Sequence, residues 1–155
     1  MLIIGKDGFN KLQKGYEVNA SDIKVRAFTV AADATTGIAA GELLAYTDKS
    51  QVYKAVSGTS DKIAGICLAT NVKTDIMFPQ STTDVKFMPG EKGGCLVRGE
   101  VAVALHGTAP TEGAAVYYDL TNRAFTTVQS GNVACPNMEF RGRTEGNVTV
   151  VNVRY

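Results

Sequence analysis

The feature that most constrains this chain is a two-residue alternation along residues 95–106. Apolar residues and glycine occupy every second position of this run, namely Cys95, Val97, Gly99, Val101, Val103 and Leu105. The intervening positions carry a mixture that includes Arg98, Glu100 and His106. Because successive side chains of a strand point to opposite faces, this spacing predicts one long β-strand with an apolar face and a mixed face.

Three hairpins are predicted around such runs. "DVKFM" is separated from the long strand by the turn "PGEKGG", "GELLAY" and "QVYKAV" flank a second turn, and "AAVYYD" and "RAFTTV" flank a third. The last two ribbons resemble each other, because Gly41, Leu44, Tyr46, Tyr53 and Val56 recur at one constant spacing as Gly113, Val116, Tyr118, Phe125 and Val128. This repetition suggests two similar ribbons at equivalent places in the fold.

Two further runs differ from simple alternation. "KIAGICLAT" is apolar at both parities, which is typical of a central strand covered on both faces. "NVTVVNVRY" changes phase, which indicates either a bulge or a terminal strand with one face against a neighbouring subunit. One ring of the tyrosine doublet is assigned to the core and the other to a subunit contact. The predicted subunit-contact residues are Tyr117, Val151, Val153 and Tyr155.

Helical signals are weak. The best candidate, residues 35–46, is interrupted by Gly37 and Gly41, each costing about 1 kcal/mol relative to alanine inside a helix. Valine and threonine each outnumber leucine, which favours strands. We therefore predict an all-β fold, an antiparallel β-barrel or jelly-roll-like sandwich, with at most one short helix. Residues 1–22 lack the regular pattern and are predicted to be an N-terminal arm or edge segment, and residues 23–155 a single β domain.

Charge excludes two classes of partner. The chain has 16 basic and 15 acidic residues, a formal net charge of +1, and no long run of like charge. We therefore expect neither nucleic acid nor an anionic membrane as a partner. The apolar run at the N-terminus breaks at Gly5 and Lys6, so it is expected to be neither a secretory signal nor a membrane span.

Catalytic patterns are also missing. The glycines of "PGEKGG" lack the spacing and the hydroxyl of a phosphate-binding loop. The single histidine, His106, lies far from Cys95 along one strand, and the acidic residues are scattered. We predict no enzymatic activity, no cofactor and no metal site. The three cysteines, Cys67, Cys95 and Cys135, are too far apart in sequence for a metal motif and are expected to be reduced and mostly buried.

The order of these motifs resembles a known family. "GELLAYTD", "KIAGICLAT", "VRGEVAVAL", "GAAVYYD" and the closing "GNVTVVNVRY" follow one another as in the small decoration, or cement, proteins of tailed-bacteriophage capsids. The likeness covers residues 41–155 and is one of layout and small motifs, none of them a catalytic signature.

This resemblance implies a protein that binds the outer surface of an expanded icosahedral shell and locks neighbouring capsomers together. It implies the major capsid protein as partner, a homo-oligomer (a trimer, with a dimer as second choice), and a place on the outer surface of the virion after synthesis in the host cytoplasm. N-terminal arms of the family often reach the shell. The implied capsid-contact residues are Met1, Leu2, Ile3, Ile4, Phe9, Lys11, Leu12, Lys14 and Tyr16.

Two other functions are compatible with a β-rich chain of this length. A trimeric nucleotide hydrolase of the dUTPase kind has a similar length and composition, but it needs a glycine-rich tail where this chain has "NVTVVNVRY". Another phage virion or surface module, a carbohydrate- or protein-binding β domain, remains the alternative that the sequence separates least well.

Overall fold

The computed structural model describes residues 12–32, 37–69 and 86–155, and all the regular structure in these ranges is β. The strands are β1 (Glu17–Val30), β2 (Ile38–Ala39), β3 (Leu43–Tyr46), β4 (Val52–Ala55), β5 (Ile63–Cys67), β6 (Lys86–Phe87), β7 (Lys92–Ala104), β8 (Ala115–Asp119), β9 (Ala124–Thr126), β10 (Val133–Glu145) and β11 (Val148–Arg154). The described part of the helix candidate, residues 37–46, forms β2 and β3 instead of a helix.

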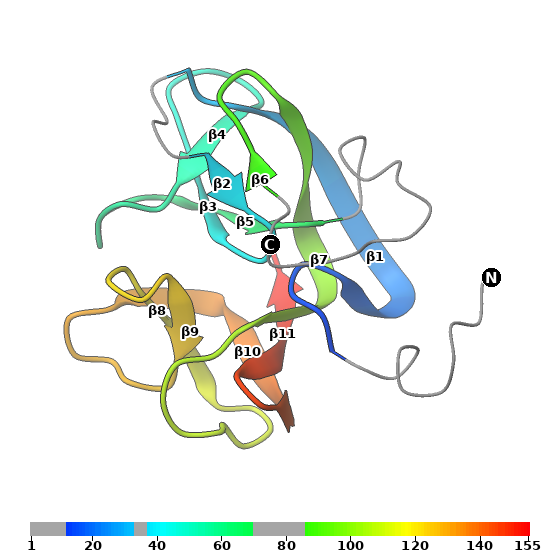
Figure 1. The fold of residues 1–155 in the computed structure, drawn as a ribbon, viewed down its shortest axis with the longest axis vertical. Coiled ribbons are helices and arrows are strands. Elements are labelled where there is room, and N and C mark those ends of the chain that lie inside the picture. The colour runs from blue at the N-terminus through cyan, green and yellow to red at the C-terminus, as the bar shows by residue number, and fades with distance from the viewer. Residues whose placement is uncertain (1–11, 33–36, 70–85) are drawn as a thin grey trace.

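Five strands close into a barrel in the order β1-β4-β3-β5-β7, because β1 pairs with β4 at one edge and with β7 at the other. The pairing of β1 with β4 is parallel and the other four are antiparallel. A closed ring with an odd number of strands needs at least one parallel pair, so the barrel is mixed. Strands β11, β10, β8 and β9 continue the sheet outward from β7 (Figure 1). The predicted all-β barrel is confirmed.

Local alternation found two of the three predicted hairpins. β3 pairs with β4 and β8 with β9, as predicted. The prediction of a hairpin between "DVKFM" and the long strand is wrong, because β6 pairs with β2 in a separate two-stranded sheet. The start of β7 is occupied by β1, with Lys92 opposite Thr29 and Gly94 opposite Ala27. Residues 88–91 therefore form a turn between strands of different sheets.

β7 does not keep one apolar face along its whole length. Cys95 and Val97 lie in one buried cluster, whereas Val101 and Val103 lie in another. The change occurs around Gly99, which has φ +132°, next to a shift in the pairing of β7 with β1. The prediction of a single apolar face is therefore correct only on each side of this irregularity.

Both faces of β11 are covered by the chain itself. Its register against β7 runs without a shift from Val148 to Arg154, and the irregularity lies in β10 between Phe140 and Thr144. Val150 packs in a small cluster with Leu12 and Ala102, while the alternate valines join the main core. Burial on both faces explains the phase change without a bulge in β11 and without a partner. The predicted central strand, β5, is confirmed between β3 and β7.

Candidate capsid-contact and subunit-contact surfaces

The described end of the predicted arm is attached to the barrel. Leu12 is 7% exposed and packs on Ala102 and Val150, and its backbone N–H donates to Glu145 Oε1 at 3.0 Å. Lys14 and Tyr16 are half-buried, and partial burial raises the pKa of Tyr16. The predicted contact residues Met1, Leu2, Ile3, Ile4, Phe9 and Lys11 lie outside the described residues.

Gly15 fixes this segment in place by backbone hydrogen bonds on two sides. Its N–H donates to the carbonyl of Ala102 and its carbonyl accepts from Ala69 N–H, each at 2.8 Å. The residue has φ +82°, and an added Cβ would lie 2.7 Å from the Cβ of Ala40. Glycine is therefore required both by the backbone conformation and by space.

The attachment sets where the preceding residues leave the barrel. Leu12 lies against β7 and β11, beside the β10 residue Glu145. The predicted boundary at Ile23 falls within β1, which already begins at Glu17 and pairs with β7 there. Residues 12–22 therefore contribute to the barrel sheet and its covering.

The predicted subunit-contact residues separate into two kinds. Val151 and Val153 have no exposed surface and belong to the main core of their own chain, so their side chains offer nothing to a neighbouring subunit. Tyr117 on β8 and Tyr155 after β11 are half-buried. Burial raises the pKa of Tyr155, and its hydroxyl has no hydrogen-bond partner among the described residues. Only the two tyrosines thus keep surface for a contact.

An ion-pair cluster centred on Arg141 was not predicted from the sequence. Its guanidinium contacts three carboxylates, those of Glu139 at 2.9 Å and of Glu100 and Glu112 at 3.2 Å each. These residues come from β7, β10 and the turn before β8. The alternating charges of "EFRGRTE" were the available signal, but which charges meet depends on the register of β7, β11 and β10.

A second unpredicted ion pair connects the β8–β9 turn with the turn that precedes β3. Arg123 Nε donates to Glu42 Oε2 at 2.7 Å, and Glu42 Oε1 accepts from the N–H of Ala39 at 3.0 Å. The Glu42 side chain is 14% exposed. Because the two residues are distant in sequence, no local pattern could have paired them.

His106 and Cys95 do not form a catalytic pair. Within the described ranges, His106 is exposed beyond the end of β7, whereas Cys95 is buried. All three thiols are free and buried, as predicted, and burial raises the pKa of Cys95 and of Cys135 to about 12. They therefore stay protonated near neutral pH and are poor nucleophiles.

Neither a metal centre nor a membrane span is found in the described part of the chain. No group of three or more metal-ligating side chains occurs among residues 12–32, 37–69 and 86–155. In the same ranges, no helix is long and apolar enough to cross a membrane.

Comparisons with known proteins agree with this architecture. A chain from a solved structure described as "The capsid of Myoviridae Phage XM1" has the same fold, with a TM-score of 0.68 and 21% sequence identity. The match covers 94% of the present chain and 91% of the phage XM1 chain. No curated protein matches the sequence.

A family model described as "Structural cement protein (E217 gp24/Pam3 gp6)" matches residues 7–155. The match extends over nearly the whole chain, including the arm end and the barrel. The chain thus belongs to the phage structural cement protein family and is a non-enzymatic structural component of the virion, associated with the capsid.

Proposed function

We propose that the protein binds the outer surface of an icosahedral phage shell and holds neighbouring capsomers together. Membership of the structural cement family carries this proposal. The partner would be the major capsid protein, and the contact would include the N-terminal residues, among them Met1, Leu2, Ile3, Ile4, Phe9 and Lys11.

The attachment of Leu12 and Gly15 supports such a role for the arm. A segment held by backbone hydrogen bonds transmits a pull on residues 1–11 directly to β7, the longest strand shared by the barrel and its extension. A mechanical clamp needs a rigid anchor of this kind. The long strands β1, β7 and β10 give that anchor a continuous hydrogen-bonded sheet.

We further propose a homo-oligomer, a trimer in preference to a dimer, with Tyr117 and Tyr155 at the contact between subunits. Several weak contacts made by one oligomer give strong retention, because each later contact forms at a high effective concentration. The half-buried rings supply contact area at a low cost in side-chain entropy.

Co-sedimentation with purified shells tests the proposal. The protein is mixed with expanded and with unexpanded shells of the cognate phage, and bound protein per capsid subunit is measured. We expect saturable binding to the expanded shell. The proposal fails if neither shell retains the protein. Light scattering of the free protein measures its mass and distinguishes trimer, dimer and monomer.

A further inference from the structure

The chain contains two copies of one folding unit. In the first, the ring order is β1-β4-β3-β5-β7. In the second, β7 pairs with β11, followed by β10, β8 and β9, and a parallel bridge between Leu105 and Phe125 leads back from β9 to the end of β7. The second ring, β7-β9-β8-β10-β11, thus repeats the first strand by strand, with β7 in the place of β1.

Backbone details repeat as well. Gly41 and Gly113 have φ +87° and +84°, and each donates its N–H at 2.7 Å to the strand that follows its hairpin. Gln51 and Arg123 occupy equivalent turn positions and are the two non-glycine residues with positive φ in the described ranges. Two all-β units would not have positive φ values at the same positions merely because both are all-β. The two units are therefore equivalent position by position.

Aromatic pairs also correspond. Tyr46 and Tyr53 face each other across the first hairpin with ring centroids 5.3 Å apart, and Tyr118 and Phe125 do so across the second at 4.9 Å. We call the end of each unit beside its aromatic pair and hairpin turn the mouth of that unit. The equivalence allows the two mouths to be compared directly.

The mouth of the second unit is occupied by the first unit. Arg123, in its hairpin turn, holds the carboxylate of Glu42, and both Tyr118 and Phe125 are fully buried. Burial raises the pKa of Tyr118, and the charge of Glu42 adds to this rise. The occupant is a short segment in which the carboxylate of Glu42 precedes Leu43, and Leu43 belongs to the same buried cluster as Tyr118 and Phe125.

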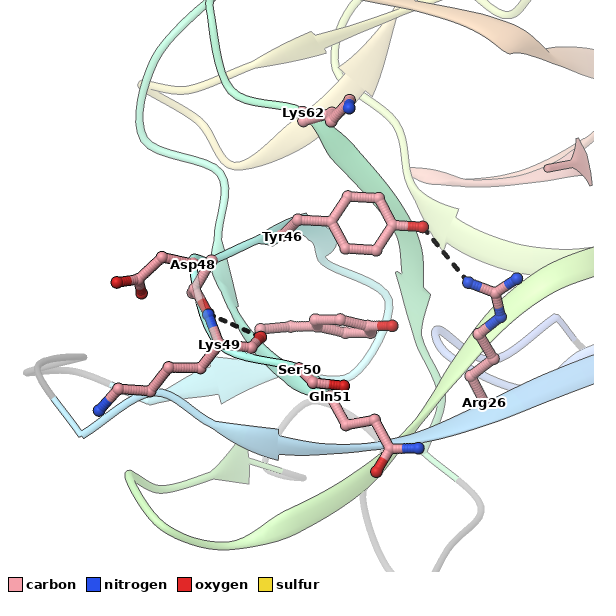
Figure 2. A pocket seen from close by; sticks show the side chains of 9 residues that line it. Arg26, Tyr46, Asp48, Lys49, Ser50, Gln51 and Lys62 are labelled. Atoms are coloured by element: carbon pink, nitrogen blue, oxygen red, sulfur yellow. Dashed lines mark hydrogen bonds between the residues drawn. The ribbon is translucent and has the colours of Figure 1, made fainter.

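The mouth of the first unit is open. It forms a surface hollow of about 940 Å³, lined by Arg26, Tyr46, Thr47, Asp48, Lys49, Ser50, Gln51, Tyr53 and Lys62. Figure 2 shows Tyr46 crossing the hollow with its hydroxyl toward Arg26, from which it accepts a hydrogen bond at 3.4 Å. In Figure 2, Arg26 lies beside the Tyr46 hydroxyl and Lys62 lies on the other side of the ring, while the Lys49 side chain extends outward from the hairpin turn.

The charges of this hollow are unbalanced. Three cationic side chains line it against the single carboxylate of Asp48. No carboxylate of the described residues lies within ion-pair distance of Arg26, Lys49 or Lys62. In the second unit, the cation that holds a carboxylate is Arg123 in the hairpin turn. Gln51 occupies that position in the first unit, so the cations of its mouth, Arg26, Lys49 and Lys62, come from other positions.

We propose that the open mouth of the first unit is a docking pocket for an acidic segment of the major capsid protein, because three cationic side chains line it against one carboxylate. This inference rests on the proposed function, since it names the pocket through which the cement protein would bind the capsid. The capsid-protein carboxylate would lie among Arg26, Lys49 and Lys62, and an adjoining apolar side chain would lie on Tyr46.

A matched pair of charge reversals tests the pocket. One variant carries Lys49→Glu and Lys62→Glu inside it, and the control carries Lys24→Glu and Lys86→Glu, exposed lysines outside it. Both change the net charge equally. Binding to expanded shells is measured by co-sedimentation over a protein titration, and thermal melts confirm that both variants fold.

We expect the pocket variant to bind shells about tenfold more weakly or worse, since two charge contacts become repulsions, with the control close to the unchanged protein. Equal weakening of both variants, or weakening of neither, would overturn the pocket while leaving the cement role intact. Failure of the unchanged protein to bind any shell would overturn the cement role and this inference together. A changed oligomer mass of the pocket variant in light scattering would assign the pocket to a second copy of the chain and overturn the capsid assignment.

Discussion

Arg123 Nε lies 2.7 Å from Glu42 Oε2, and this ion pair fastens the β8–β9 turn to the turn that precedes β3. Through this ion pair, the segment before β3 of the first unit covers the mouth of the second unit. Glu42 also accepts a backbone hydrogen bond from Ala39, so its carboxylate is held from two directions.

Removing the charge of Glu42 should destabilise the fold. Glu42→Gln keeps the shape and an acceptor for Ala39 but removes the charge from a carboxylate that is 14% exposed and leaves the guanidinium of Arg123 without its counter-charge. We expect the free energy of unfolding to fall by about 1 kcal/mol in urea titrations. Glu112→Gln is the control, because that carboxylate also contacts an arginine but is 66% exposed, and it should change stability by less than about 0.5 kcal/mol. Equal effects would contradict the role given to burial.

Gly15 and Gly113 allow steric contact to be separated from backbone strain. Their φ values are +82° and +84°, but an added Cβ meets Ala40 at 2.7 Å in the first and no atom within 4 Å in the second. We expect Gly113→Ala to cost about 1 kcal/mol from backbone strain and Gly15→Ala about 2–4 kcal/mol, because overpacking is added. Thermal and urea unfolding measure both, and equal costs would show that residue 15 is not clamped against Ala40.

Truncation should separate anchoring from shell contact. Deleting residues 1–11 retains the hydrogen bonds of Leu12 and Gly15, whereas deleting residues 1–16 removes them. We expect both truncations to weaken co-sedimentation with shells, and only the longer one to lower the melting temperature by several degrees. Unchanged shell binding in both truncations would remove the arm from the proposed contact.

Stability should decrease at alkaline pH. Burial raises the pKa of Cys95 and of Cys135 to about 12 from an ordinary value near 9. Between these values the unfolded chain has already released the thiol protons that the folded chain still binds, so the free energy of unfolding falls as pH rises. The expected slope approaches about 1.4 kcal/mol per pH unit per thiol.

Urea titrations between pH 8 and pH 11 measure this slope, and Cys135→Ala should make it shallower because one titrating thiol is removed. Burial of Tyr118, which raises its pKa, adds to the loss in the same direction at the upper end of this range. A free energy of unfolding that is constant over this range would contradict the burial of the thiols.

Local sequence patterns predicted which segments form strands, whereas the order of the strands in the sheet depends on pairing between distant segments. The apolar run "GELLAY" predicted β3, which is buried on both faces, and the alternation in "AAVYYD" predicted β8, which is buried on one face. No local pattern in the sequence indicates that β1 pairs with both β4 and β7, or that β6 pairs with β2. The family resemblance seen over residues 41–155 indicated the function, which no catalytic or binding motif does, and a family model that matches residues 7–155 confirms the family.

Alternation indicates that a side chain is covered but not by which chain. Val151 and Val153, which the pattern places at a subunit contact, are buried in the core of their own chain. Conversely, the similarity of the two ribbons was visible in the sequence, whereas the open mouth around Tyr46 emerged only when the folded units were compared.

Rupture of the capsid is the most direct measure of a cement protein's action. Virions assembled without this protein are heated, DNA release is followed by dye fluorescence, and the purified protein is then added back at saturating concentration. The account predicts release at a lower temperature without the protein and restoration of the higher temperature on add-back. Identical release temperatures with and without the protein would contradict a stabilising role on the shell.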